Sequence, residues 1–235
     1  MLFDDGIGTV EYIKHSGDDL TVVNAARVSF GAHKDFLDER DEKLINYLAT
    51  HNHSSPFEHC NITFRFVVPL FIRSQHHRHR TWAYNEISRR YTSVDMKFYE
   101  PCNFRGQHTS NRQASTNDLL NPDMNFITGN NKSLLPRPPN LASDVVKRHH
   151  DASLKLYEDL ISAGICREQA RGVLPQNLYT EYYGTVSLHN LVKFISLRVH
   201  EGAQWEIQQV ARACAKIAFE CFPVSMRAFA DRMAL

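Results

Sequence analysis

The 235-residue sequence lacks the patterns of membrane and secreted proteins. No apolar run approaches the roughly 20 residues that a helix needs to cross a bilayer. Residues 1–5 are acidic and soon followed by glycines, so no signal peptide is visible. The five cysteines are odd in number and include no C-x-x-C pair, which favours reduced thiols. We therefore expect a cytoplasmic protein without a membrane partner.

Two further absences concern nucleotides. The chain has no G-x-G-x-x-G fingerprint and no Walker loop, so arginines would have to hold any bound nucleotide cofactor. The formal net charge is only +1, whereas a protein that binds polynucleotides through a basic tail would carry a larger positive excess. We expect no nucleic acid partner. Hydrophobic residues make up 43% of the chain, enough for one core, and we assign residues 1–235 to a single domain.

Hydrophobic periodicity predicts more helices than strands, without regular alternation, which is typical of an α+β fold. We expect strands at residues 9–14, 61–68 and 176–186. We expect helices at residues 18–28, 38–49, 145–162, 187–200 and 203–220, one starting at Pro69, and a short last helix around Met226. Asp18 or Asp19 would cap the first helix. Ser187 would cap the helix at residues 187–200.

A polar stretch with four prolines interrupts this pattern between about residues 103 and 143. Structureless segments of this length are uncommon in compact domains. We interpret the stretch as an insertion that forms a surface loop or is partly disordered. A subunit-contact arm or a substrate lid is the alternative.

The most informative segment covers residues 78–91, RHRTWAYNEISRRY, with four arginines beside a histidine, a carboxylate and an amide. The planar guanidinium offers paired donors and keeps its charge, so these arginines suit phosphates. The carboxylate and the amide suit ribose hydroxyls or base edges. On a helix that begins at Pro69, Gln75 would lie beside Arg78 and His79. The segment therefore predicts a site for a phosphate-rich ligand.

This segment resembles the signature of the flavin-dependent thymidylate synthases, RHR-x-x-S-x-N-E-x-S-x-R-Y. Eight positions match in order and spacing, namely Arg78, His79, Arg80, Asn85, Glu86, Ser88, Arg90 and Tyr91. One position departs, because Ala83 stands where the family usually has a serine hydroxyl. The resemblance continues outside the signature, at residues 25–29, 53–59, 167–171, 174–175, 177–180, 197–198 and 203–207.

The resemblance implies a central, mostly antiparallel sheet with flanking helices, assembled into a homotetramer with shared active sites. It implies reductive methylation of dUMP to dTMP, with methylenetetrahydrofolate as the carbon donor. FAD reduced by NADPH would supply the hydride. The redox chemistry belongs to the flavin, whereas protein groups position and polarise the reactants.

The resemblance also assigns residues to roles. Arg198 matches the catalytic arginine that favours the ionised pyrimidine. The implied cofactor residues are His53, Ser55, Arg78, His79, Arg80, Glu86, Ser187, His189 and Lys193. The implied substrate residues are Gln75, His76, His77, Arg78, Glu86, Ile87, Ser88, Arg89, Arg90, Arg171 and Arg198.

Ser187, His189 and Lys193 stand where some relatives use asparagine and arginine to contact FAD. His189 and Lys193 are one helical turn apart, so they lie on one face of the expected helix. We hypothesise that these two residues replace the lost donors.

Three other interpretations of these residues compete with this assignment. Ser88 could be a nucleophile with His79 as its base, but its arginine neighbours favour a phosphate donor, and we assign no covalent protein nucleophile. A metal-dependent hydrolase could use the histidines, but neighbouring arginines would repel a cation, and we expect no metal. The histidines in question are His51, His53, His59, His76, His77 and His79. An RNA- or DNA-binding module could use the basic patch at residues 73–90, but Asn85 and Glu86 favour a small nucleotide.

Overall fold

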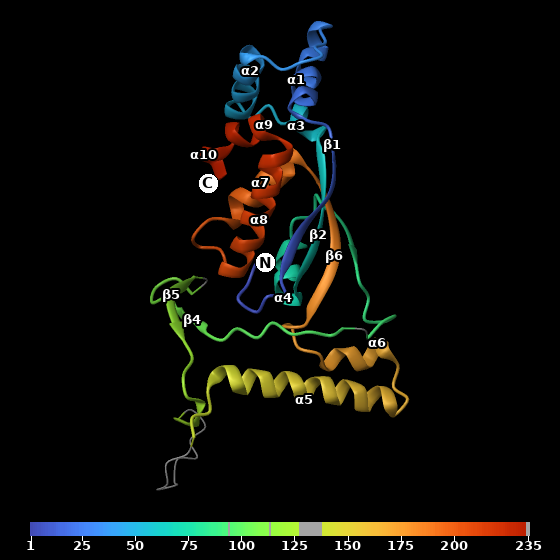
Figure 1. Ribbon diagram of the computed structural model, residues 1–235, viewed down its shortest axis with the longest axis vertical. Helices are drawn as coiled ribbons and strands as arrows, with labels where there is room; N and C mark the ends of the chain where they lie inside the picture. The colour runs from blue at the N-terminus through green and yellow to red at the C-terminus, as the bar shows by residue number, and fades with distance from the viewer. Residues whose placement is uncertain (94, 113, 127–137, 234–235) are drawn as a thin grey trace.

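A four-stranded sheet forms the centre of the elongated molecule, seen in a computed structural model that describes residues 1–93, 95–112, 114–126 and 138–233 (Figure 1). The strands lie in the order β1–β2–β6–β3, and each neighbouring pair is antiparallel. Their bounds are β1 Thr9–Ser16, β2 Asn61–Pro69, β3 Ala83–Glu86 and β6 Tyr179–Ser187. The expected antiparallel sheet with flanking helices is therefore confirmed.

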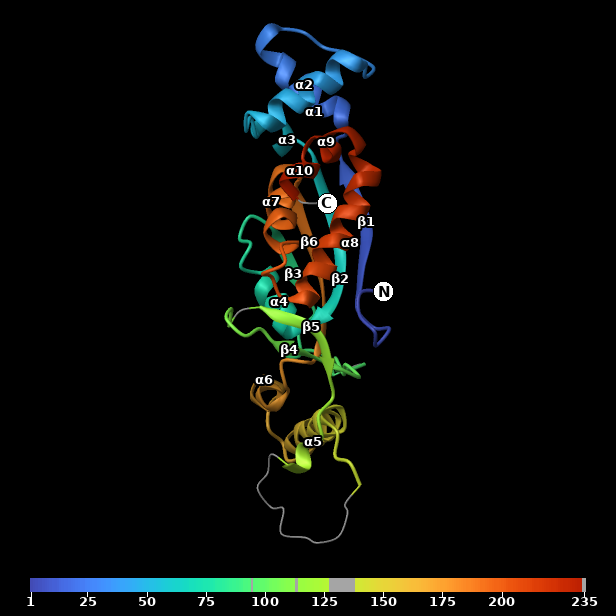
Figure 2. The same cartoon turned by 90° about the vertical axis from the view of Figure 1, so that its left-hand side faces the viewer.

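Helices α7 and α8 cover one face of the sheet, and other helices lie at the two ends of the molecule (Figures 1 and 2). The α-helices are α1 Asp19–Arg27, α2 Glu39–Thr50, α3 Ser55–Glu58, α4 Leu70–His76, α5 Ala142–Ser162, α6 Arg167–Ala170, α7 Leu188–Arg198, α8 Trp205–Cys221, α9 Pro223–Ala228 and α10 Ala230–Met233. Single 3₁₀ turns cover Val28–Phe30, Met124–Phe126 and Arg171–Val173. No helix within the described ranges is long and apolar enough to cross a membrane.

The core lies between the sheet and helices α7 and α8. Phe64 and Phe66, two apart on β2, are fully buried, as expected for residues that share one face of a strand. Phe66 stacks on Tyr182 of β6 with ring centroids 4.9 Å apart. Phe194 of α7 and Val210 of α8 are also fully buried. Burial of each large apolar side chain contributes about 1.5–3 kcal/mol, so this layer holds the sheet in place.

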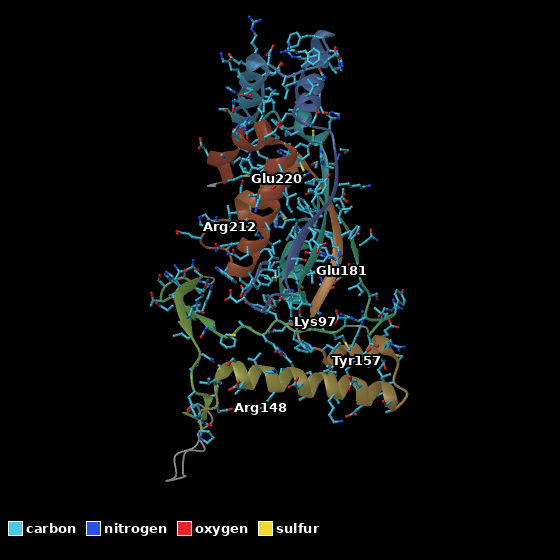
Figure 3. All side chains as sticks on the ribbon, in the orientation of Figure 1. Lys97, Arg148, Tyr157, Glu181, Arg212 and Glu220 are labelled. Carbon is cyan, nitrogen blue, oxygen red and sulfur yellow. The ribbon has the colours of Figure 1, made fainter. Side chains whose placement is uncertain are left out.

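The opposite face of the sheet carries a charge cluster that joins three strands. Arg65 of β2 donates from Nε to Glu181 of β6 at 2.8 Å, and from its terminal nitrogen to Glu11 of β1 at 2.8 Å. Glu181 is labelled in Figure 3. Its pKa is lowered mainly by the hydrogen bond from Arg65.

Two neighbouring aspartates fix the first helix. Asp18 caps α1 as predicted, because its carboxylate accepts the Thr21 N–H at 2.7 Å. Asp19 is buried and accepts the N–H groups of Val224 and Ser225, each at 2.8 Å. The Ser225 hydroxyl donates to the same carboxylate at 2.6 Å. Asp19 thereby satisfies the first N–H groups of α9, where a negative charge is favoured.

Several predicted boundaries are wrong. Ser187 occupies the N-cap of α7, but its hydroxyl accepts from the Asn190 side chain at 3.0 Å and caps no backbone N–H. The strand expected at residues 176–186 begins only at Tyr179, because the Leu178 N–H turns back to the Pro175 carbonyl. The helix expected at residues 145–162 begins at Ala142, and strand β3 was not predicted.

Part of the polar insertion at residues 103–143 forms a β-hairpin, so the expectation of a loop is wrong there. Its strands are β4 Phe104–Gln107 and β5 Ser115–Leu120, which pair antiparallel. The Arg105 guanidinium lies 4.6 Å from the ring centroid of Trp205 at the start of α8. This cation–π contact attaches the hairpin to the helical layer. Residues 127–137 of the insertion lie outside the described residues.

Candidate functional site

Strand β3 divides the signature segment into two ends. Residues 77–82 form a turn after α4, and β3 then pairs with β6, with Ala83 opposite Thr185 and Glu86 opposite Tyr182. Residues 87–93 continue outside the sheet. Since four strand residues span about 10 Å, the groups before and after β3 have different surroundings.

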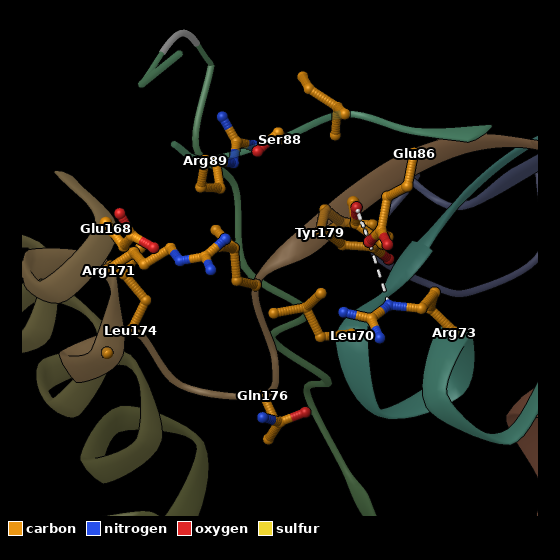
Figure 4. A pocket seen from close by; sticks show the side chains of 14 residues that line it. Leu70, Arg73, Glu86, Ser88, Arg89, Glu168, Arg171, Leu174, Gln176 and Tyr179 are labelled. Carbon is orange, nitrogen blue, oxygen red and sulfur yellow. Dashed lines mark hydrogen bonds and ion pairs between the residues drawn. The ribbon is translucent and has the colours of Figure 1, made fainter. Parts of the chain in front are cut away.

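A cavity of about 560 Å³ lies at the second end, where the signature meets α6 and β6 (Figure 4). The predicted substrate residues that line it are Glu86, Ile87, Ser88, Arg89 and Arg171. Arg171 comes from the turn after α6, about 80 residues further along the chain, so the fold brings these groups together. The size is typical of small-molecule pockets.

The charges around this cavity favour an anion. Three arginines line it, at positions Arg73, Arg89 and Arg171, against two glutamates, Glu86 and Glu168. Arg90 does not line the cavity but pairs with Glu168 at 3.6 Å. The excess of cationic side chains suits a phosphate-bearing ligand.

Glu86 is held by Arg73 and Thr180, two residues to which the sequence assigned no role in the site. The Arg73 Nε of α4 lies 3.0 Å from Glu86 Oε1, and the Thr180 hydroxyl of β6 donates to the same oxygen at 2.7 Å. The Arg73 N–H is not aligned with the oxygen, so the first contact is an ion pair and not a hydrogen bond. Only the pairing of β3 with β6 beside α4 could reveal this arrangement.

Ser88 has the surroundings of a ligand-binding hydroxyl. Its Oγ accepts the Arg90 N–H at 3.2 Å, and its carbonyl accepts the N–H groups of Tyr91 and Thr92. His79, the base considered for a nucleophilic role, contacts Arg198 instead. A serine needs an adjacent base to become a nucleophile, so this geometry favours binding over covalent chemistry.

At the first end of the signature, His79 meets the predicted catalytic residue. The Arg198 Nε at the end of α7 donates to His79 Nε2 at 3.0 Å. Burial, and secondarily the charge of Arg198, lower the pKa of His79 to about 4. His79 is therefore neutral near pH 7, with its proton on Nδ1 and Nε2 as the acceptor. The contact orients the guanidinium, and within the described ranges its terminal nitrogens make no hydrogen bond.

His76 and His77, two of the predicted substrate residues, both lie against aromatic side chains. His76 is fully buried, its Nδ1 lies 2.7 Å from the Tyr182 hydroxyl, and burial lowers its pKa well below the usual value. It therefore belongs to the core and has no exposed surface for a ligand. His77 stacks on Tyr84 with ring centroids 4.0 Å apart. Within the described ranges, no three His, Cys, Asp or Glu residues are grouped to hold a metal ion.

The remaining predicted residues in and just after α4 do not line the cavity. The Gln75 side chain donates to Gln204, the residue before α8. Helix α4 ends at His76, so Arg78 and His79 follow it in a turn and not as helical neighbours of Gln75. Arg78 and Arg80 are exposed.

A second group of predicted cofactor residues gathers around the start of α7. His53 and Ser55 are exposed before and in α3, and His53 lies 5.9 Å from the Tyr47 ring. The pKa of His189 on α7 is lowered, mainly by burial, although the nearby charge of Glu58 opposes the shift. This interaction with Glu58 shows that α3 lies beside α7. Lys193 follows His189 by one turn and is exposed.

The predicted cofactor residues, taken together, include the donors that a dinucleotide cofactor needs. Arg78, Arg80 and Lys193 are exposed cations, and a diphosphate carries matching negative charge. Hydroxyl and imidazole groups from Ser55 and His189 add hydrogen-bonding capacity. The donor chemistry therefore fits FAD, although the arrangement uses no glycine-rich turn.

Comparison with known proteins gives one family. The model of the family described as thymidylate synthase complementing protein matches residues 11–224. A flavin-dependent thymidylate synthase of Thermus thermophilus is 40% identical over 226 residues, covering 96% of this chain and 77% of the relative. A flavin-dependent thymidylate synthase of Thermotoga neapolitana is 40% identical over 223 residues, which cover 94% of this chain and 90% of the relative. The crystal structure of a UMP/dUMP methylase of Streptomyces cacaoi, bound with 5-Br UMP, aligns with a TM-score of 0.79 and 30% sequence identity. The alignment covers 97% of this chain and 96% of the methylase chain.

Proposed function

The chain belongs to the family of flavin-dependent thymidylate synthases, and from this premise we propose that it converts dUMP to dTMP. It is an enzyme of this class. The proposed reaction takes its one-carbon unit from methylenetetrahydrofolate and its reducing equivalents from NADPH through FAD. The proposal includes a homotetramer in the cytoplasm, with active sites shared between subunits.

The observation that carries the proposal is the cavity at the second end of the signature. It combines an excess of arginine with the Ser88 hydroxyl and the Glu86 carboxylate. A nucleoside monophosphate presents a dianionic phosphate, sugar hydroxyls and a base, which match these three kinds of group. A UMP/dUMP methylase bound with 5-Br dUMP aligns with a TM-score of 0.78 and 32% identity, which supports a uridine nucleotide as the ligand.

In this site Arg89 and Arg171 would bind the phosphate together with Ser88. Arg90 would contribute from the rim, and Gln75 and Arg78 would reach the nucleotide of a neighbouring subunit. Glu86 would accept a hydrogen bond from the sugar. These contacts use charge-assisted hydrogen bonds, which are about twice as strong as neutral ones.

Arg198 would supply the electrostatic part of catalysis. Methylation at C5 requires negative charge to develop on the uracil ring. A guanidinium that is already oriented by neutral His79 stabilises that charge without a proton transfer and without rearrangement. Burial lowers the pKa of Arg198, so the charge acts in a partly desolvated place where it has more effect.

FAD would be held by Arg78, Arg80 and Lys193, with His53, Ser55 and His189 beside them. When bound, the flavin supplies the hydride chemistry that no protein side chain can perform. His79, Glu86 and Ser187 complete the set of residues that we propose for the cofactor.

The direct test is conversion of dUMP to dTMP by the purified protein with added FAD, NADPH and methylenetetrahydrofolate. We expect product only when all components are present, and an Arg198→Ala protein serves as the matched control. Folded protein that binds FAD, shown by its absorption band, yet forms no dTMP would contradict the proposal.

A further inference from the structure

Arg73 lies outside the signature, yet it faces the cavity that we assign to dUMP (Figure 4). It is on α4, and its Nε is 3.0 Å from Glu86 Oε1 at the end of β3. The pair therefore connects a helix to the edge strand of the sheet. Its contact spans 13 residues of sequence, and none of the family segments recognised in the sequence contains position 73.

The Glu86 carboxylate is fixed from two directions and still has a free side. Thr180 of β6 donates to the same oxygen that Arg73 approaches, at 2.7 Å. The other oxygen, Oε2, accepts no hydrogen bond in the described part of the chain. A carboxylate only accepts hydrogen bonds, so Oε2 is an acceptor presented to the cavity.

We propose that Arg73 is a positioning residue for substrate binding. It holds the Glu86 carboxylate so that Oε2 receives a hydroxyl of the bound nucleotide, an inference that rests on the proposed dUMP site. Arg73 acts through Glu86 and does not itself bind the phosphate.

The exposure of the pair argues that its role is in binding and not in folding. The side chains of Arg73 and Glu86 are 30% and 25% exposed, and ion pairs of this kind contribute little to stability. A carboxylate held by two neighbours loses less freedom when the ligand binds than one that must first be ordered. Removing Arg73 therefore weakens nucleotide binding more than it weakens the fold.

A second role for Arg73 would be purely electrostatic, because it is one of three arginines around the cavity. The two roles predict different coupling with Glu86. If Arg73 acts through Glu86, its loss has little effect once the Glu86 carboxylate is gone. If it attracts the phosphate independently, the two losses multiply.

The experiment is a double-mutant cycle on the FAD-loaded protein, with Arg73→Gln, Glu86→Gln and the double variant. Calorimetry gives the dissociation constant for dUMP, and turnover gives KM and kcat. We expect Arg73→Gln and Glu86→Gln each to weaken dUMP binding roughly tenfold, as for one charge-assisted hydrogen bond. We expect kcat to change less than about threefold, and the double variant to be within about twofold of Glu86→Gln.

Two further variants complete the test. Arg73→Lys keeps the charge beside Glu86 and should restore dUMP binding to within about threefold of the unchanged protein. Arg65→Gln removes a different arginine–glutamate pair, between Arg65 and Glu181 of β6 on the opposite face of the sheet, and should leave dUMP binding unchanged.

Multiplying effects in the double variant, or unchanged dUMP affinity of Arg73→Gln, would overturn the inference. If Arg73→Gln fails to fold, then Arg73→Lys with lost dUMP binding would also count against it. The binding cycle does not depend on turnover. Protein that binds dUMP with the expected coupling but makes no dTMP would refute the proposed function and leave the role of Arg73 intact.

Discussion

The two ends of the signature segment offer opposite surroundings, although only the four residues of β3 separate them. At the first end, His79 packs against Phe194 with ring centroids 4.9 Å apart and receives a hydrogen bond from Arg198. At the second end, Glu86 and Arg89 line an open cavity of mixed charge. The desolvated end suits stabilisation of charge that appears during a reaction, and the open end suits binding of a ligand that is already charged.

The variant Arg198→Ala tests whether the first end of the signature stabilises charge during the reaction. We expect kcat to fall roughly 10²–10³-fold, because one preorganised charge at the developing anion is lost. FAD binding, followed by absorbance titration, should remain close to that of the unchanged protein. Arg198→Lys keeps a positive charge but lacks the planar guanidinium, so its kcat should lie between those of Arg198→Ala and the unchanged protein. A kcat for Arg198→Ala within about threefold of the unchanged protein would remove the distinction between the ends.

A second change tests the open end. Arg171→Ala should raise KM for dUMP by about 10- to 100-fold with a smaller effect on kcat, because it removes a charged hydrogen-bond donor to the phosphate. Arg167, on the preceding helix α6, does not line the cavity and provides the control as Arg167→Ala. Equal effects of the two variants would show that the net positive charge of this region, and not a contact from Arg171, determines binding.

A third change concerns the surface at the start of α7, where several predicted cofactor residues lie. Lys193→Ala should weaken FAD binding roughly fivefold, since an exposed charge contributes up to about 1 kcal/mol. FAD titration of the apoprotein measures this, with Lys216→Ala on α8 as an exposed lysine away from that surface. An unchanged dissociation constant would exclude Lys193 as a replacement for the missing family donors.

The smallest expected effect is on acid stability. The pKa of His79 is about 4 in the folded chain against an ordinary 6.5, so the unfolded chain binds the proton first. This residue therefore lowers stability as the pH falls from 6.5 to 4, and adds nothing further below 4. His79→Gln should reduce the loss of Tm between pH 7 and pH 4.5 by about 2–4 °C. An identical loss in both proteins would show that His79 titrates normally.

Local signals in the sequence predicted the helices well. Asp18 followed by Thr21 forms a capping box within four residues, so the start of α1 was visible. Strand β3 was missed because AYNE lies inside a charged motif and becomes a strand only through its pairing with β6. The hairpin was missed for a related reason, since most of β5 is exposed and lacks an apolar alternation.

In the candidate site too, residues adjacent in sequence could be predicted, whereas contacts between separate elements could not. Glu86, Ile87, Ser88 and Arg89 could be assigned from the signature because they are adjacent in sequence and stay together in the fold. The burial of His76 against Tyr182 could not be predicted, because it depends on the packing of α4 under the sheet. Arg73 and Thr180 were missed because their partner Glu86 is reached only across separate elements.

The bonds from Asp19 to residues 224 and 225 bear on the order in which the chain can mature during synthesis. They join groups 205 and 206 positions apart, so the carboxylate has no partners there until residues 224 and 225 have left the ribosome. A buried carboxylate without donors is costly, so α1 should dock last even though its own cap forms early. Nascent chains halted before residue 224 should therefore keep α1 accessible to protease, while completed chains protect it.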